Sequence, residues 1–279
     1  MKTVKNQAET LKNKKLYVFD MDGTIYLGDK VFDFAIRFIN HLRESGKRVL
    51  FFTNNASRSK TAYIKRLAFL GFSPIEDEIM TSGDVTKAFL ERHRAGKSVY
   101  LLGTSELTKD FKRDGIKLVG DDETRADIVV SSFDKELTYK KLFNACNFIM
   151  NGAEFLSTHP DFVCPIEGGI EPDSGAIAAA ITAATGVVPK YFGKPCRETL
   201  DMICEVTGIG KEDICVFGDR LYTDIAFGRN NGVTAVLVMT GETTAEQVER
   251  AKTSEKPDFT FASLDDVDKL IFGDRKNGV

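Results

Sequence analysis

The stretch KKLYVFDMDGTIYLGD, residues 14–29, joins an apolar run to two acidic residues. The run that begins at Leu16 predicts a buried strand, and Asp20 and Asp22 stand at its end. An unpaired carboxylate is costly to bury, so this position requires a compensating partner. On extended backbone, side chains two residues apart point to the same face, so both acids can reach one ligand while Met21 points into the core.

Similar apolar runs recur along the chain and alternate with amphipathic segments. The runs are continuously apolar rather than alternating, which is typical of parallel strands covered on both faces. Their alternation with helices predicts an α/β fold around a parallel sheet. The predicted strands are 16–20, 48–53, 98–103, 127–133, 214–219 and 234–239, and the clearest predicted helices are 34–45 and 139–150.

Length and composition restrict the class of protein. A chain of 279 residues with 42% hydrophobic residues can form one large domain or two ordinary ones. A net charge of −3 argues against a nucleic-acid-binding protein. Five cysteines without a C-x-x-C pair favour thiols in a reducing compartment. The first 15 residues contain no apolar signal segment, and the apolar run from Ala176 is too short for a membrane span, so we expect a soluble cytoplasmic protein.

Polar residues follow three of the predicted strands, where ligands bind in open α/β sheets. Besides Asp20 and Asp22, the sequence TNNASRS begins at Thr53, and GDRLYTD places Asp219 and Asp224 after a later strand. A Gly-Lys-Pro turn with Lys194 at its centre follows the short strand KYFG. These strand ends and this turn together predict a functional site.

Each of these signals is weak when taken alone. A D-x-D pair is expected by chance, and Asp266 and Asp268 repeat it in what we expect to be a solvated helix start. Thr53, Asn54 and Ser57 can cap the following helix as readily as they can bind an anion. A lone lysine in a loop is usually solvated, and acids near a helix start are ordinary.

The four motifs in this order resemble the haloacid dehalogenase-like hydrolase superfamily. The matching pieces are DMDGT, TNN, the lysine of GKP, and GDRLYTD. The sequence THPDFVCPIEGGIEPDSGAIAAAI, residues 158–181, is similar to the subgroup of NagD-like and 4-nitrophenylphosphatase-like phosphatases. The resemblance implies a Rossmann-like core at 1–81 and 189–279, with an inserted α/β cap domain at 82–188.

The resemblance also implies a role for each matching residue. Asp20 would be the nucleophile and Asp22 the general acid and base of a phosphatase that forms an aspartyl-phosphate. Mg²⁺ would be bound by Asp20, the Asp22 carbonyl and Asp219, with Asp224 in support. Phosphoryl oxygens would be bound by Thr53, the backbone at Asn54, and Lys194.

The substrate would be a small phosphomonoester, such as a nucleoside monophosphate or a sugar phosphate, enclosed by the cap. The candidate substrate contacts are Asn55, Arg58, His159, Asp161 and Asp173. His159 can face a leaving group or form a hydrogen bond within a turn, and Asp173 can contact substrate or cap a helix. Relatives often have PGAG where this chain has PDSG, residues 172–175, a departure that bears on substrate preference.

Two other functions remain open, a phosphotransferase that acts on sugars and a non-catalytic module that binds phosphorylated metabolites. The presence of Asp20, Asp22, Lys194 and Asp219 favours an enzyme over a binding module. We expect no nucleic-acid partner and no membrane association, and the sequence leaves a homodimer open.

Overall fold

The computed structural model describes residues 4–166 and 168–273 and divides into two compact units. The first unit contains the chain up to Phe52, then Ile64–Ile79, and the chain from Ile203 onward. The second contains Thr53–Tyr63 and Met80–Met202. The predicted division into a core and a cap places its boundaries elsewhere, at 82 and 188, and stays a prediction.

The first unit is built on a parallel sheet, as the apolar runs predict. Its strand order is β14-β13-β12-β1-β4-β5, and β1 pairs with β12 and β4 in parallel register. The strands are β1 (Leu16–Phe19), β4 (Arg48–Thr53), β5 (Ile79–Thr81), β12 (Ile214–Gly218), β13 (Thr234–Val238) and β14 (Phe259–Phe261). The last residue of β4 and the last two of β5 belong to the second unit. A separate antiparallel hairpin, β2 (Tyr26–Leu27) and β3 (Lys30–Val31), follows β1.

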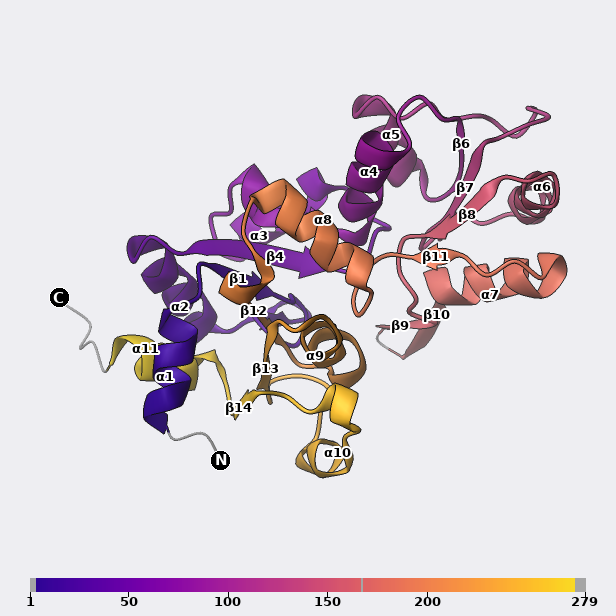
Figure 1. Cartoon of the computed structure of the whole chain (residues 1–279). Coiled ribbons are helices and arrows are strands. Elements are labelled where there is room, and N and C mark those ends of the chain that lie inside the picture. The colour runs from indigo at the N-terminus through magenta and orange to yellow at the C-terminus, as the bar shows by residue number, and fades with distance from the viewer. Residues whose placement is uncertain (1–3, 167, 274–279) are drawn as a thin grey trace. The chain divides into compact units, whose positions relative to one another are not determined.

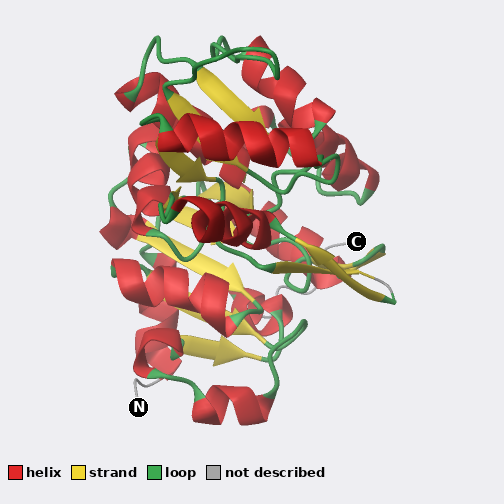
Figure 2. Ribbon diagram, turned by 90° about the vertical axis from the view of Figure 1, so that its right-hand side faces the viewer, coloured by secondary structure: helices red, strands yellow, loops and turns green. Residues whose placement is uncertain are grey.

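The helices of this unit accompany the sheet along the chain. They are α1 (Val4–Lys12), α2 (Asp33–Glu44), α9 (Ala226–Asn231), α10 (Ala245–Arg250) and α11 (Leu264–Phe272). Helix α3 (Lys60–Phe69) and helix α8 (Arg197–Thr207) each have residues in both units. Figure 2 shows helices lying along the strands, as continuously apolar strands require.

Aromatic rings form the centre of the first unit. Phe19 of β1 stacks on Phe217 of β12 with ring centroids 4.9 Å apart, and Phe38 of α2 meets both edge-on. All three rings are fully buried, and each stabilises the fold by roughly 1.5–3 kcal/mol through burial. This packing holds β1 against β12 and therefore aligns the ends of these two strands.

The second unit has its own parallel sheet of order β11-β8-β7-β6 (Figure 1). Its strands are β6 (Val99–Leu102), β7 (Ile128–Ser131), β8 (Glu154–Ser157) and β11 (Lys190–Tyr191). Its helices are α4 (Ser82–His93), α5 (Ser105–Arg113), α6 (Tyr139–Met150) and α7 (Ser174–Thr185). The hairpin of β9 (Val163–Ile166) and β10 (Gly169–Pro172) forms a two-stranded ribbon, visible in Figure 2.

Side-chain caps fix where most helices of the second unit begin. Thr81 caps α4 and forms a reciprocal pair with Asp84, while Thr104, Thr138 and Asp173 cap α5, α6 and α7. Such caps satisfy backbone N–H groups that have no partner within the helix.

Among the described residues, every helix is too short or too polar to cross a bilayer.

Candidate active site

Three carboxylates of the first unit converge at the ends of neighbouring strands. Asp20 follows β1, Asp219 follows β12, and Asp224 lies in the π-helical turn Leu221–Ile225. One oxygen of each acid lies within 4.8 Å of the others. The register that pairs Phe19 with Phe217 brings Asp20 and Asp219 together, because parallel strands end at the same edge of a sheet.

Glycines allow the chain to pack tightly around Asp219. A Cβ atom at Gly23 would lie 2.4 Å from Asp219 Oδ2, and one at Gly241 only 2.0 Å from the same atom. A Cβ at Gly218 would likewise meet Asp224 at 2.2 Å. Any side chain at these positions would displace a carboxylate, so the acidic cluster depends on them.

The electrostatics of this cluster fit a bound cation. Asp219 is buried, and its Oδ1 accepts no hydrogen bond from the described residues. Burial, followed by the charges of Asp20 and Asp224, raises the pKa of Asp219 to about 7. A divalent cation that prefers oxygen ligands would relieve both the burial cost and the repulsion.

Asp22, the second acid of the DMD sequence, is more exposed than the acids of the cluster. Its side chain is exposed, whereas Met21 is buried as predicted. Asp22 forms a backbone bridge with Tyr26, and its Oδ1 accepts a hydrogen bond from Gly28 N at 3.4 Å. The hairpin β2–β3 thus contacts Asp22 through Tyr26 and Gly28. Because the Asp22 carboxylate is exposed, it can exchange protons with water.

Asn54 organises a second polar group, which lies in the second unit. Its Nδ2 donates to the Lys194 carbonyl at 2.8 Å and to Asp161 Oδ2 at 3.0 Å, and its Oδ1 accepts from Lys194 N at 2.7 Å. Lys194 is 2% exposed, so the alternative that it is a solvated loop lysine is contradicted. Sequence-distant motifs therefore meet here through one asparagine side chain.

The residues around Asn54 define a turn rather than a helix cap. Thr53 Oγ1 accepts from Asn55 N at 3.1 Å, and Asn55 Oδ1 accepts from Ser57 N at 2.9 Å. The helix itself begins later, with Ser59 Oγ accepting from Ala62 N. Of the two alternatives for Thr53, Asn54 and Ser57, capping of this helix is therefore contradicted. Arg58 is exposed.

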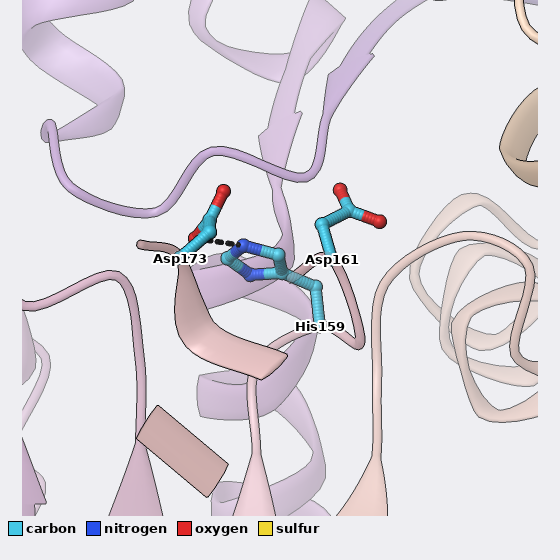
Figure 3. Close-up of side chains that lie close together, drawn as sticks. All are labelled: His159, Asp161 and Asp173. Atoms are coloured by element: carbon cyan, nitrogen blue, oxygen red, sulfur yellow. Dashed lines mark hydrogen bonds and ion pairs between the residues drawn. The ribbon is translucent and has the colours of Figure 1, made fainter. Parts of the chain in front are cut away.

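Three further predicted residues cluster in the second unit (Figure 3). His159 and Asp173 are both buried, with His159 Nε2 2.7 Å from Asp173 Oδ1. Asp173 also caps α7, so the helix-cap interpretation of this residue is confirmed. Asp161 lies beside them, and ligand atoms of the three side chains lie within 4.8 Å of one another. His159 Nε2 is directed at Asp173 Oδ1, at hydrogen-bond distance.

Sequence reasoning missed the loop after β13, which holds Asp219 in place. Glu242 N donates to Asp219 Oδ2 at 2.7 Å, and Thr243 Oγ1 donates to the Asp219 carbonyl. Arg220 Nε lies 2.9 Å from Glu242 Oε2. The sequence does contain a feature that marks this loop as part of the site. The loop follows a predicted strand and contains Gly241 in the sequence TGET.

Two family models match the chain, and so does a curated protein along nearly its whole length. One model, described as haloacid dehalogenase-like hydrolase, matches residues 17–117, and one described as HAD-hydrolase-like matches residues 191–267. The acid sugar phosphatase of Staphylococcus saprophyticus is 35% identical over 261 residues, which is 94% of this chain and 99% of that protein. The chain belongs to the haloacid dehalogenase-like hydrolase family.

Solved structures of this hydrolase family agree with that assignment. The 4-nitrophenylphosphatase of Thermotoga maritima is 41% identical, with a TM-score of 0.87 over 94% of this chain and 99% of that one. The p-nitrophenyl phosphatase of Archaeoglobus fulgidus is 30% identical, with a TM-score of 0.85 over 92% and 99%. Within the haloacid dehalogenase-like hydrolases, this chain is a NagD-like phosphatase that hydrolyses small phosphomonoesters.

Proposed function

We propose that this NagD-like phosphatase hydrolyses a sugar phosphate or a nucleoside monophosphate through an aspartyl-phosphate on Asp20. The observation that carries the proposal is the cluster of Asp20, Asp219 and Asp224 at the ends of β1 and β12. The name of the S. saprophyticus relative, acid sugar phosphatase, supports the sugar phosphate as the first substrate to test.

The two acids of the DMD sequence divide the chemistry between them. Asp20 attacks the phosphorus atom, and its bond to phosphorus forms as the bond to the ester oxygen breaks. Asp22 donates a proton to the leaving oxygen, and then accepts a proton from the water that attacks the aspartyl-phosphate. That second step releases inorganic phosphate and restores both carboxyl groups. The exposure of Asp22 supports its role, because an acid and base must exchange protons between the steps.

The residues of the acidic cluster fit a magnesium ion. Asp20, the Asp22 carbonyl and Asp219 would bind Mg²⁺, which when bound offsets the negative charge of the acids and the phosphoryl group. Asp224 supports this arrangement through its own loop, since its Oδ2 accepts from Arg220 N at 3.2 Å. A relative described as glycerol phosphate phosphatase from Mycobacterium tuberculosis, 28% identical, was solved in complex with magnesium.

Phosphoryl oxygens are bound in this proposal by Thr53, the backbone at Asn54, and Lys194. The hydrogen bonds between Asn54 and the Lys194 backbone support the proposal, because they hold two of these three groups in one arrangement. Preorganised donors stabilise the charge that develops during phosphoryl transfer.

Substrate preference is proposed to lie in the cap, residues 82–188, with the core at 1–81 and 189–279. Asn55, Arg58 and Asp161 are the proposed contacts to the substrate, and His159 and Asp173 support them from the interior.

All five cysteines are thiols, which supports a cytoplasmic location.

One assay tests this mechanism directly. Turnover of p-nitrophenyl phosphate is measured with Mg²⁺ and after its removal by a chelator, for the wild type, Asp20→Asn, and the exposed control Asp266→Asn. We expect removal of Mg²⁺ or Asp20→Asn to lower kcat at least about a hundredfold, with the control unchanged. Wild-type turnover by Asp20→Asn would overturn the mechanism.

The products and a substrate panel test the remaining parts of the proposal. Release of one inorganic phosphate per alcohol formed, in the presence of added sugars, is expected of a phosphatase. Transfer of the phosphoryl group to the sugar would instead identify a phosphotransferase. A panel of sugar phosphates and nucleoside monophosphates, compared by kcat/KM, identifies the substrate class.

A further inference from the structure

His159 is buried and takes no part in the chemical steps assigned to Asp20 and Asp22. Its side chain is 0% exposed, so it cannot touch a substrate without a rearrangement of the second unit. Figure 3 shows its ring directed toward Asp173, with Asp161 to one side. Asp173 Oδ1 also accepts a hydrogen bond from Ser174 N at 2.6 Å, which ties the ring to the first turn of α7.

The other ring nitrogen of His159 leads toward Asn54. Nδ1 lies 3.0 Å from Thr158 Oγ1 and 3.3 Å from Ser82 Oγ. The Ser82 hydroxyl in turn donates to the Asn54 carbonyl. A short chain of hydrogen bonds therefore runs from α7 through the imidazole to the backbone of Asn54.

A steric contact joins His159 to the lysine loop. Gly193 has a φ of +71°, and a Cβ atom there would lie 2.5 Å from His159 Cβ and 2.9 Å from Asn54 Oδ1. The loop that carries Lys194 thus rests directly on the base of the imidazole side chain. Asn54 holds the same loop through its two hydrogen bonds to the Lys194 backbone.

We infer that His159 is a positioning residue that fixes Lys194, acting through Asn54 and through its contact with Gly193. Because a side chain shifted by about an ångström can cost a hundredfold in rate, such support affects phosphate binding without any direct contact. The inference rests on the proposed phosphate-binding role of Lys194.

A double-mutant cycle of His159→Gln and Lys194→Met tests the inference. The inhibition constant of inorganic phosphate, kcat and KM for p-nitrophenyl phosphate, and the unfolding temperature are measured for each variant in the presence of Mg²⁺. The matched control is His93→Gln, which makes the same change at an exposed histidine of the same unit. Ser82→Ala, which removes only the link to Asn54, is the second variant if His159→Gln does not fold.

The expected result is that each single variant weakens phosphate binding about tenfold or more, while the double variant binds no more weakly than Lys194→Met alone. A merely structural role would instead give independent effects. The inference would be overturned if the double variant weakened phosphate binding by the product of the two single effects. Unchanged phosphate binding by His159→Gln or by Lys194→Met would overturn it as well. Wild-type turnover by Asp20→Asn would overturn the proposed mechanism but not this inference. The inference is tested by the inhibition constant of inorganic phosphate, which does not depend on turnover by Asp20.

Discussion

The Nε2 atom of His159 lies 2.7 Å from Oδ1 of Asp173, and both side chains are buried. Burial by itself lowers the pKa of His159, but the charge and hydrogen bond of Asp173, together with the charge of Asp161, raise it above its usual 6.5. A histidine whose pKa is higher in the folded protein stabilises the fold at low pH. This stabilisation is complete below about 6.5 and is lost as pH rises through the folded pKa.

We therefore expect the free energy of unfolding to fall as the pH rises above about 6.5, and to fall less in His159→Gln. Urea denaturation followed by circular dichroism measures it, since the chain has no tryptophan. His93→Gln, at an exposed position, should retain the wild-type slope. Equal slopes for the wild type and His159→Gln would contradict the prediction.

Replacing Gly193 with alanine should destabilise the second unit more than the same change at Gly186. Both glycines have left-handed backbone, with φ of +71° and +73°, so each substitution costs roughly 1–2 kcal/mol for that conformation. Only at Gly193 would the new Cβ also meet His159 and Asn54, whereas Gly186 has open space around it. The overlap should add about 1–3 kcal/mol, measured by urea denaturation. Equal losses of unfolding free energy at Gly193 and Gly186 would show that the loop around Gly193 accommodates the new Cβ without strain.

Asp219→Asn should stabilise the metal-free protein and abolish its response to magnesium. Removing one negative charge relieves repulsion within the cluster, for a gain of about 1 kcal/mol or more. Thermal unfolding with increasing Mg²⁺ should raise Tm in the wild type and in the exposed control Asp266→Asn, but not in Asp219→Asn. An equal rise in Asp219→Asn would place the cation elsewhere.

Arg66 should support the hairpin β2–β3, which contacts Asp22 through Tyr26 and Gly28. Its guanidinium lies over the Tyr26 ring at 5.1 Å, donates to the Gly28 carbonyl at 2.7 Å and pairs with Asp29 at 3.3 Å. We expect Arg66→Ala to cost about 1 kcal/mol of stability and to lower kcat about tenfold, with a smaller effect on KM.

The control for this prediction is Arg250→Ala, which removes an exposed arginine from α10. Steady-state kinetics and thermal unfolding are compared for the two variants and for Arg66→Lys, which keeps the charge but loses the planar fork. An unchanged kcat in Arg66→Ala would show that the hairpin holds Asp22 without this arginine.

Local patterns were sufficient to predict most of the first sheet. The apolar run 48–53 is β4, and the run that begins at Ile214 is β12, because continuous burial of neighbouring residues leaves a local signature. The hairpin β9–β10 has no such signature. Its described side chains are largely exposed, so nothing in its composition marks it as a strand pair.

Burial of individual charges was not predictable in the same way. Asp268 was expected to be solvated at a helix start, yet it is buried and pairs with Arg37 and His41, at 3.0 Å and 2.7 Å. Its partners come from α2, more than two hundred residues earlier. The expectation was therefore wrong for Asp268, although its neighbour Asp266 is exposed.

The sequence by itself determined the α/β architecture, the strand ends at which Asp20 and Asp219 stand, and the order of the four motifs. These features follow from residues that are neighbours in the chain. Only the tertiary structure decided that Gly241 packs on Asp219, and that the aspartate of the PDSG sequence pairs with His159. Such contacts join segments distant in sequence, and their geometry depends on how every intervening strand and helix packs.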